Sequence, residues 1–167
     1  ASRGIGRALA VMLAQRGANL VLIARDKKAL ALAQAECKKE NPSGKIDTFS
    51  CDLSNRKAIE TTCATIRRKH PVLAGIINNA GYALPGYFHE LPADEFDRAV
   101  KTDYLGAVHL TRGLHALVQK GGLISFTSSV VGYMGVFGYS SYAGPKFALV
   151  GFAETLRQEL DQRGVQV

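Results

Sequence analysis

Short apolar runs alternate with segments of helical periodicity along almost the whole chain, and this alternation restricts the fold more than any other feature. The apolar runs have the length of buried strands, and in the segments between them apolar residues recur at helical spacing. We expect strands at 18–24, 45–50, 72–77 and 123–127, and helices at 7–16, 27–40, 55–69, 93–119 and 142–163. Strands that alternate with helices predict an α/β fold with a doubly wound, mostly parallel sheet.

Polar or glycine-rich positions follow several of the expected strands. In a doubly wound fold, ligands bind at the carboxyl ends of the strands. The positions that fall there, or at the start of the first helix, are Ser2–Gly6, Arg25, Asp52, Asn79 and Ser129. Their coincidence at one edge of the sheet predicts a ligand site more strongly than any single motif does.

Composition narrows the class of protein. The chain has 167 residues, enough for one domain over 1–167, and a formal charge of +7. Its basic residues are scattered without an interleaved aromatic platform, which favours a solvated surface over nucleic-acid binding. No apolar run reaches membrane-spanning length. The three cysteines are widely spaced and no metal-ligand spacing occurs, so we expect reduced thiols, a cytoplasmic location and no metal.

A hydroxyl, a phenol and an ammonium are predicted to meet at the end of the last expected strand. Tyr142 and Lys146 are four residues apart at a helix start and share a face, and Ser129 follows the strand. A phenol exchanges protons poorly at neutral pH, because its ordinary pKa is about 10. An ammonium about 4 Å away favours the phenolate by up to about 4 kcal/mol at an effective dielectric constant of about 20. We therefore expect Lys146 to lower the pKa of Tyr142 toward the range useful for acid–base catalysis. The pair alone is more often an ordinary surface pair on a helix.

The motifs together resemble those of the short-chain dehydrogenase/reductase family, over essentially all 167 residues. The resemblance rests on Gly4-Ile5-Gly6, Asp52-Leu53, Asn78–Gly81, Ser129 and the Tyr142–Lys146 segment. Ser129, rather than Ser128, stands at the family's usual separation from the tyrosine. The resemblance implies a single Rossmann-like NAD(P)-binding domain.

The resemblance also implies roles for these residues. Tyr142 would protonate a carbonyl oxygen as hydride arrives, Lys146 would tune the phenol and bind the nicotinamide ribose, and Ser129 would polarise the carbonyl. Further cofactor-binding positions would be Ser2, Arg3, Gly4, Ile5, Gly6, Arg25, Asp52, Leu53, Asn79, Ala80 and Gly81. Glycines at a helix start let a phosphate approach backbone N–H groups at the positive end of the helix dipole.

Charge at the end of the first expected strand indicates which dinucleotide is bound. Where the family places an acidic residue for the ribose hydroxyls of NAD, this chain has Ala24 followed by Arg25, and Arg3 lies in the glycine turn. Two cations near a ribose favour a 2′-phosphate. We therefore expect NADPH (NADP) as cofactor.

Three departures from the family pattern stand out. The first strand and the C-terminal segment of the family are missing, so we expect the chain to be a fragment truncated at both ends. Asp103 replaces the usual Asn, which holds a water in a proton relay to the lysine. Pro145 lies near the start of the helix that carries Tyr142, which places that start near Ser141, since proline is tolerated only at the first turn.

The expected function is NADPH-dependent reduction of a small-molecule or lipid-like ketone. The helix entry Tyr104-Leu105-Gly106 and the stretch from Phe137 to Phe147 resemble those of 3-ketodihydrosphingosine reductases and related bacterial reductases. A 3-oxoacyl carrier-protein reductase, a hydroxysteroid-type dehydrogenase and a non-catalytic nucleotide-binding scaffold remain alternatives. The resemblance implies a homodimer or homotetramer built on the two long apolar helices.

Overall fold

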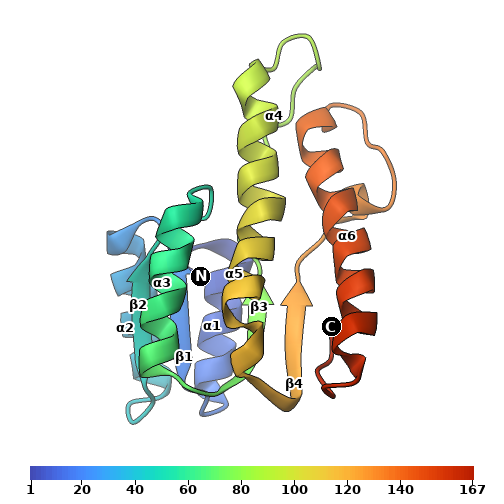
Figure 1. The fold of residues 1–167 in the computed structure, drawn as a ribbon. Coiled ribbons are helices and arrows are strands. Elements are labelled where there is room, and N and C mark those ends of the chain that lie inside the picture. Colours follow the sequence, from blue (N-terminus) through green and yellow to red (C-terminus); the bar gives the residue numbers. More distant parts are fainter. The chain divides into compact units, whose positions relative to one another are not determined.

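The computed structural model describes residues 1–167, which form two compact units, Ala1–Asp52 and Leu53–Val167. Each unit combines parallel strands with helices, in the α/β pattern that the sequence predicts (Figure 1). No helix of the structure has both the length and the apolar character needed to cross a bilayer.

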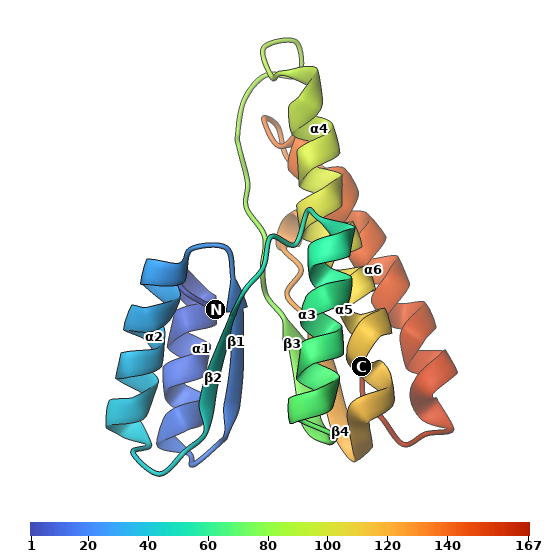
Figure 2. The same ribbon diagram turned by 60° about the vertical axis from the view of Figure 1, so that its left-hand side comes forward.

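The first unit is a parallel strand pair covered by two helices. Its elements are α1 (Gly4–Gln15), β1 (Leu20–Ala24), α2 (Lys27–Glu40) and β2 (Ile46–Ser50). In the strand pair Leu20 lies opposite Ile46 and Ala24 opposite Ser50. The two helices lie side by side (Figure 2) and bury small and aliphatic side chains against the strands. This core consists of Ala10, Ala14, Leu22, Leu30, Ala33, Cys37 and Ile46.

The second unit contains the other parallel pair and the longest helices. Its elements are α3 (Arg56–Lys69), β3 (Leu73–Asn78), α4 (Ala93–Ala99), the π-helix η1 (Val100–Leu105), α5 (Gly106–Leu114), the 3₁₀-helix η2 (His115–Leu117), β4 (Val118–Phe126), the 3₁₀-helix η3 (Val130–Gly132) and α6 (Ser140–Asp161). Helices α5 and α6 contact the β3–β4 pair, and α3 packs against α5. Near the C-terminus, Gln166 forms an isolated parallel bridge with Leu123.

The long helix predicted over 93–119 is only partly correct. Helical backbone runs without a gap from α4 to α5, but residues 100–105 between them form a π-helix instead of an α-helix. The helical part also ends earlier than predicted, because β4 begins at Val118. The sequence places that strand only at 123–127, because Gly121 and Gly122 break its apolar pattern. In the structure Gly121 has a φ of +78°, which other residues rarely adopt, and the pairing with β3 shifts register there, from Leu73 opposite Val118 to Gly75 opposite Leu123.

Two helix starts lie close to those predicted. Helix α3 begins at Arg56, and the Asn55 side chain caps it by accepting a hydrogen bond from the Ala58 N–H at 3.1 Å. Helix α6 begins at Ser140, close to the predicted start, so Pro145 falls in its second turn. A proline there provides no N–H for the helix and is normally costly.

The homodimer or homotetramer expected on the two long apolar helices stays a prediction.

Gly75 in β3 lies so close to the paired strand β4 that a side chain at this position would clash with it. A Cβ atom built at this position would lie 2.6 Å from the backbone oxygen of Leu123 on the paired strand. Gly75→Ala should therefore lower the free energy of unfolding by about 1–3 kcal/mol, because backbone must move to make room. Urea unfolding of the full-length protein measures the change.

Gly151→Ala is the matched control for this substitution. Gly151 lies inside α6 and a Cβ atom there would meet nothing within 4 Å, so alanine should stabilise the helix by up to about 1 kcal/mol. If both variants are equally stable, close strand packing does not determine the residue at position 75.

Candidate active site

The structure brings Ser129, Tyr142 and Lys146 together in the second unit. Tyr142 and Lys146 lie one turn apart on α6, and the Lys146 Nζ atom is 5.3 Å from the centroid of the Tyr142 ring. Ser129 follows β4, caps η3 by accepting a hydrogen bond from the Val131 N–H at 3.3 Å, and lowers the pKa of Tyr142 through its hydroxyl. A strand end, a short 3₁₀ turn and a helix start thus supply the three groups.

Lys146 is held inside the protein by two oxygen groups. Its Nζ atom donates a hydrogen bond to the backbone oxygen of Thr127 at 3.0 Å and lies 3.8 Å from Oδ2 of Asp103. Both charged residues are buried, with exposed fractions of 3% for Lys146 and 1% for Asp103. Burial lowers the pKa of Lys146, and the Asp103 charge partly opposes this.

Asp103 lies in the π-helical turn η1, where the helical backbone departs from regular geometry. Both of its carboxylate oxygens accept hydrogen bonds from the Tyr82 N–H, at 3.1 and 3.3 Å. Burial raises the pKa of Asp103 to about 6, while Lys146 and the Tyr82 N–H lower it and the Glu95 charge raises it. The position predicted to hold a water therefore carries a buried carboxylate paired directly with the lysine.

The pKa of Tyr142 moves in the direction opposite to the prediction. Burial raises the pKa of this phenol, the Ser129 hydroxyl lowers it, and the charge of Asp103 raises it again. Lys146 does not produce the expected lowering, and its ammonium is paired with Asp103. The sequence prediction treated the lysine as an uncompensated charge and is wrong on this point.

The segment 79–81 frames the ion pair. A Cβ atom at Gly81 would lie 3.0 Å from Oδ2 of Asp103 and 3.2 Å from Nζ of Lys146, so any larger side chain would press on both groups. Asn79 accepts a hydrogen bond from the Thr127 hydroxyl at 3.3 Å, and Ala80 between them is exposed. These contacts give Asn79 and Gly81 structural roles within the protein, besides the cofactor contacts predicted for them.

The predicted phosphate turn lies at the start of α1 in the first unit. Gly4 has a φ of +50° and a Cβ atom there would meet nothing within 4 Å. Arg3 stands at the N-cap without a side-chain cap, and the first turn contains no acidic residue. Ser2 and Gly6 are buried and Ile5 is exposed. Open N–H groups without a competing carboxylate fit a phosphate at this helix start.

The two arginines expected near the 2′-phosphate have different surroundings. The Arg3 guanidinium donates a hydrogen bond to Oδ2 of Asp26 at 2.8 Å, and Asp26 also caps α2 by accepting from the Ala29 N–H. Arg25, directly after β1, is exposed and forms no ion pair. Asp52 and Leu53, at the junction of the units, are both partly buried. Of the two arginines, Arg25 is therefore the one whose charge is available to the expected 2′-phosphate.

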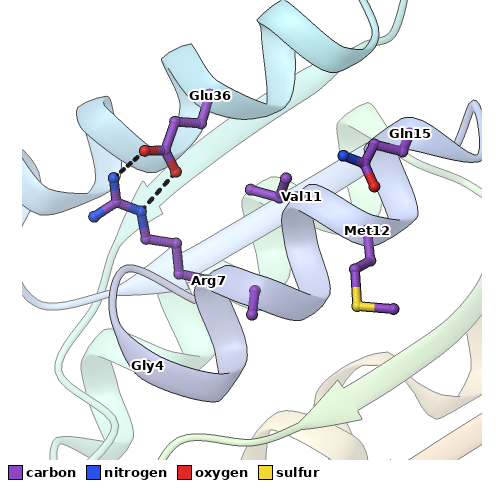
Figure 3. Close-up of a pocket in the computed structure, with 7 residues that line it drawn as sticks. Gly4, Arg7, Val11, Met12, Gln15 and Glu36 are labelled. Carbon is purple, nitrogen blue, oxygen red and sulfur yellow. Dashed lines mark hydrogen bonds and ion pairs between the residues drawn. The ribbon is translucent and has the colours of Figure 1, made fainter.

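A surface hollow of about 420 Å³ lies along α1 in the first unit (Figure 3). It is lined by Gly4, Arg7, Ala8, Val11, Met12, Gln15 and Glu36. Its charged groups face each other, since the Arg7 Nε atom donates to Oε2 of Glu36 at 2.7 Å (Figure 3). None of the candidate catalytic residues lines this hollow, so its size does not make it the active site.

Sequence reasoning missed the groups that hold the site together. The Thr127 backbone oxygen and the Tyr82 N–H are main-chain groups, which no residue pattern reveals. Beside them, the buried Glu95 pairs with Arg98, which also donates to the Tyr82 hydroxyl at 2.9 Å. The Glu95–Arg98 spacing of three on a helix was a readable signal for this pair.

Comparison with known proteins identifies the family of the chain. The family model described as short chain dehydrogenase matches residues 1–167. A 3-ketodihydrosphingosine reductase of Dictyostelium discoideum is 36% identical, with 95% of this chain and 53% of the relative covered. The protein of the same name from Bos taurus is 33% identical, with 99% and 52% covered. A 3-oxoacyl-acyl-carrier-protein reductase of Vibrio harveyi is 31% identical, with 100% and 67% covered.

The solved structures show the same fold. The structure of a protein described as a short-chain alcohol dehydrogenase from Sinorhizobium meliloti has a TM-score of 0.89 and 24% identity, with 99% of this chain and 66% of that chain covered. The chain spans about half the length of the sphingosine-type relatives that it matches. The family match over all residues and the parallel α/β fold lead to one conclusion: this chain belongs to the short-chain dehydrogenase/reductase family of oxidoreductases.

Proposed function

We propose that the chain is the nucleotide-binding and catalytic part of an NADPH-dependent reductase that converts a ketone to a secondary alcohol. The observation that carries the proposal is the cluster of Ser129, Tyr142 and Lys146 around one end of β4. The reaction adds a hydride to the carbonyl carbon and a proton to the carbonyl oxygen. Bound NADPH would supply the hydride.

The protein's own groups account for the proton and for the position of the carbonyl. The Tyr142 hydroxyl donates its proton to the carbonyl oxygen as negative charge develops there. The Ser129 hydroxyl donates a hydrogen bond to the same oxygen and stabilises that charge. Lys146, fixed by Thr127 and Asp103, keeps a positive charge beside the phenol and would contact the nicotinamide ribose. Asp52, Leu53 and residues 79–81 would contact the adenosine half.

The surface beside the cluster favours an apolar, lipid-like ketone. Residues 79–88 and 130–145 contain no charged side chain. The two segments are joined by a hydrogen bond from the Gly86 N–H to the Gly138 oxygen at 2.9 Å. Val131 is buried, but six of their large apolar side chains are more than half exposed: Tyr87, Phe88, Val130, Tyr133, Met134 and Phe137. An exposed apolar patch of this kind marks a binding surface. The names of the sphingosine-type relatives fit a substrate with a long alkyl chain.

The similarity to the Vibrio harveyi enzyme supports a second candidate, a 3-oxoacyl thioester as the ketone. Assays of the full-length protein with a long-chain amino ketone, a 3-oxoacyl thioester and a steroid ketone would separate the candidates. We expect the highest kcat/KM for the amino ketone. A higher value for the thioester would assign the second candidate.

Tyr142→Phe tests the proposed proton donor. The substitution keeps the ring and removes only the hydroxyl, so kcat for ketone reduction should fall by about 10²–10⁴-fold, the usual contribution of a general acid. NADPH binding, followed by cofactor fluorescence, should persist. Tyr139→Phe is the matched control, since Tyr139 lies with its ring centroid 6.2 Å from that of Tyr142, and should retain activity.

The same experiment separates an enzyme from a nucleotide-binding scaffold. A scaffold would bind NADPH but reduce no ketone, and Tyr142→Phe would then change nothing. Ketone reduction that survives in Tyr142→Phe at the wild-type rate would show that another group donates the proton.

Arg25→Ala tests the cofactor preference. Loss of a charge-assisted contact to a 2′-phosphate should reduce the ratio of kcat/KM with NADPH to kcat/KM with NADH by about tenfold or more. Arg3→Ala should have a smaller effect, because Arg3 is already paired with Asp26. Arg16→Ala, at the other end of α1, is the control. An unchanged preference in Arg25→Ala would contradict the assignment.

A further inference from the structure

Asp103 is the one acidic side chain in direct contact with the catalytic cluster. Its side chain is fully buried and meets Lys146 at 3.8 Å. Its carboxylate also accepts two hydrogen bonds from the Tyr82 N–H, which fix its position. An asparagine could accept from the same N–H, but it would bring no charge. The carboxylate therefore adds an electrostatic effect to a position that an amide could also fill.

The charged and titratable groups around Asp103 come from three elements. Helix α6 contributes Lys146 and Tyr142, the segment after β3 contributes Tyr82, and α4 contributes Glu95. The Glu95 carboxylate is itself paired with Arg98. With Glu95 paired to Arg98, the remaining charges are the Lys146 ammonium, 5.3 Å from the centroid of the Tyr142 ring, and the Asp103 carboxylate, which raises the pKa of the Tyr142 phenol.

We propose that Asp103 is a positioning residue that holds the Lys146 ammonium by a direct ion pair and offsets its charge at Tyr142, so that protonation of Asp103 strengthens Tyr142 as a proton donor. The proposal rests on the function proposed above, in which Tyr142 gives its proton to the substrate. It differs from a purely structural role, in which the hydrogen bonds to Tyr82 would be all that matters.

The sign of the effect follows from the charges. While Asp103 is ionised, the ammonium is compensated and the Asp103 charge raises the pKa of Tyr142, which makes the phenol a weaker acid. Once Asp103 is protonated, the ammonium acts on the phenol alone and makes it a stronger acid. Because the pKa of Asp103 is raised to about 6, this change falls between pH 5 and 7. Reduction should therefore be faster on the acid side of that range.

The pH profile of Asp103→Asn tests the proposal. For the full-length wild-type protein with NADPH and a ketone, kcat should rise by about threefold between pH 7.5 and pH 5, as expected if the phenol pKa shifts by about one unit. Asp103→Asn keeps the acceptor for Tyr82 and should show a flat profile near the upper value. The proposal would be falsified if kcat of Asp103→Asn rose between pH 7.5 and pH 5 as in the wild-type protein, or if its kcat were below the wild-type value at every pH.

A second measurement requires neither enzymatic activity nor the Asp103→Asn variant. In wild-type protein labelled with ¹³C at the tyrosine Cζ atoms, the Tyr142 signal, assigned by its loss in Tyr142→Phe, should shift with an apparent pKa of about 6. A Tyr142 signal that does not change between pH 5 and 7.5 would overturn the ion-pair account. If the signal shifts while no ketone is reduced, the proposed function fails and the electrostatic coupling stands.

Discussion

The burial of the Lys146 ammonium is the constraint on which the rest of the candidate site depends. Removing a charge from water is costly unless oxygen groups surround it. The Thr127 oxygen and the Asp103 carboxylate provide that compensation, and the Tyr82 N–H in turn fixes the carboxylate. Gly81 provides the space in which the two charges meet. The end of β3, the π-helical turn, the end of β4 and the start of α6 are thereby tied to one buried ion pair.

This ion pair changes how the phenol must be understood. A tyrosine beside an isolated ammonium would have a lowered pKa, and the sequence alone supports that expectation. Here burial and the neighbouring carboxylate raise the pKa of Tyr142, while the Ser129 hydroxyl partly offsets them. The phenol therefore stays protonated over the physiological range, which suits a group that donates a proton during reduction. The cost is a weaker acid, and the charge state of Asp103 controls how weak.

The sequence predicted the parts of the structure that depend on local pattern. Alternating strands and helices, the parallel pairing and the convergence of Tyr142 with Lys146 follow from periodicity and spacing. The predictions from sequence were wrong where contacts between distant residues determine the structure. Strand β4 begins at Val118, before its predicted start, and its pairing with β3 shifts register around Gly121, which has a positive φ. The pKa of Tyr142 could not be predicted, because the position of the Asp103 charge depends on the π-helical turn.

The central claim is that the cluster around Tyr142 and Lys146 performs ketone reduction with a nicotinamide dinucleotide. Isotope transfer tests it most directly. Full-length protein would be incubated with a ketone and NADPH carrying deuterium at both C4 positions, and the alcohol analysed by mass spectrometry and NMR. The account predicts one deuterium on the carbinol carbon of each product molecule, and about 10²–10⁴-fold less of this deuterated alcohol with Tyr142→Phe at the same protein concentration and time. An alcohol that carries only protium at that carbon, or the absence of any alcohol despite bound NADPH, would contradict it.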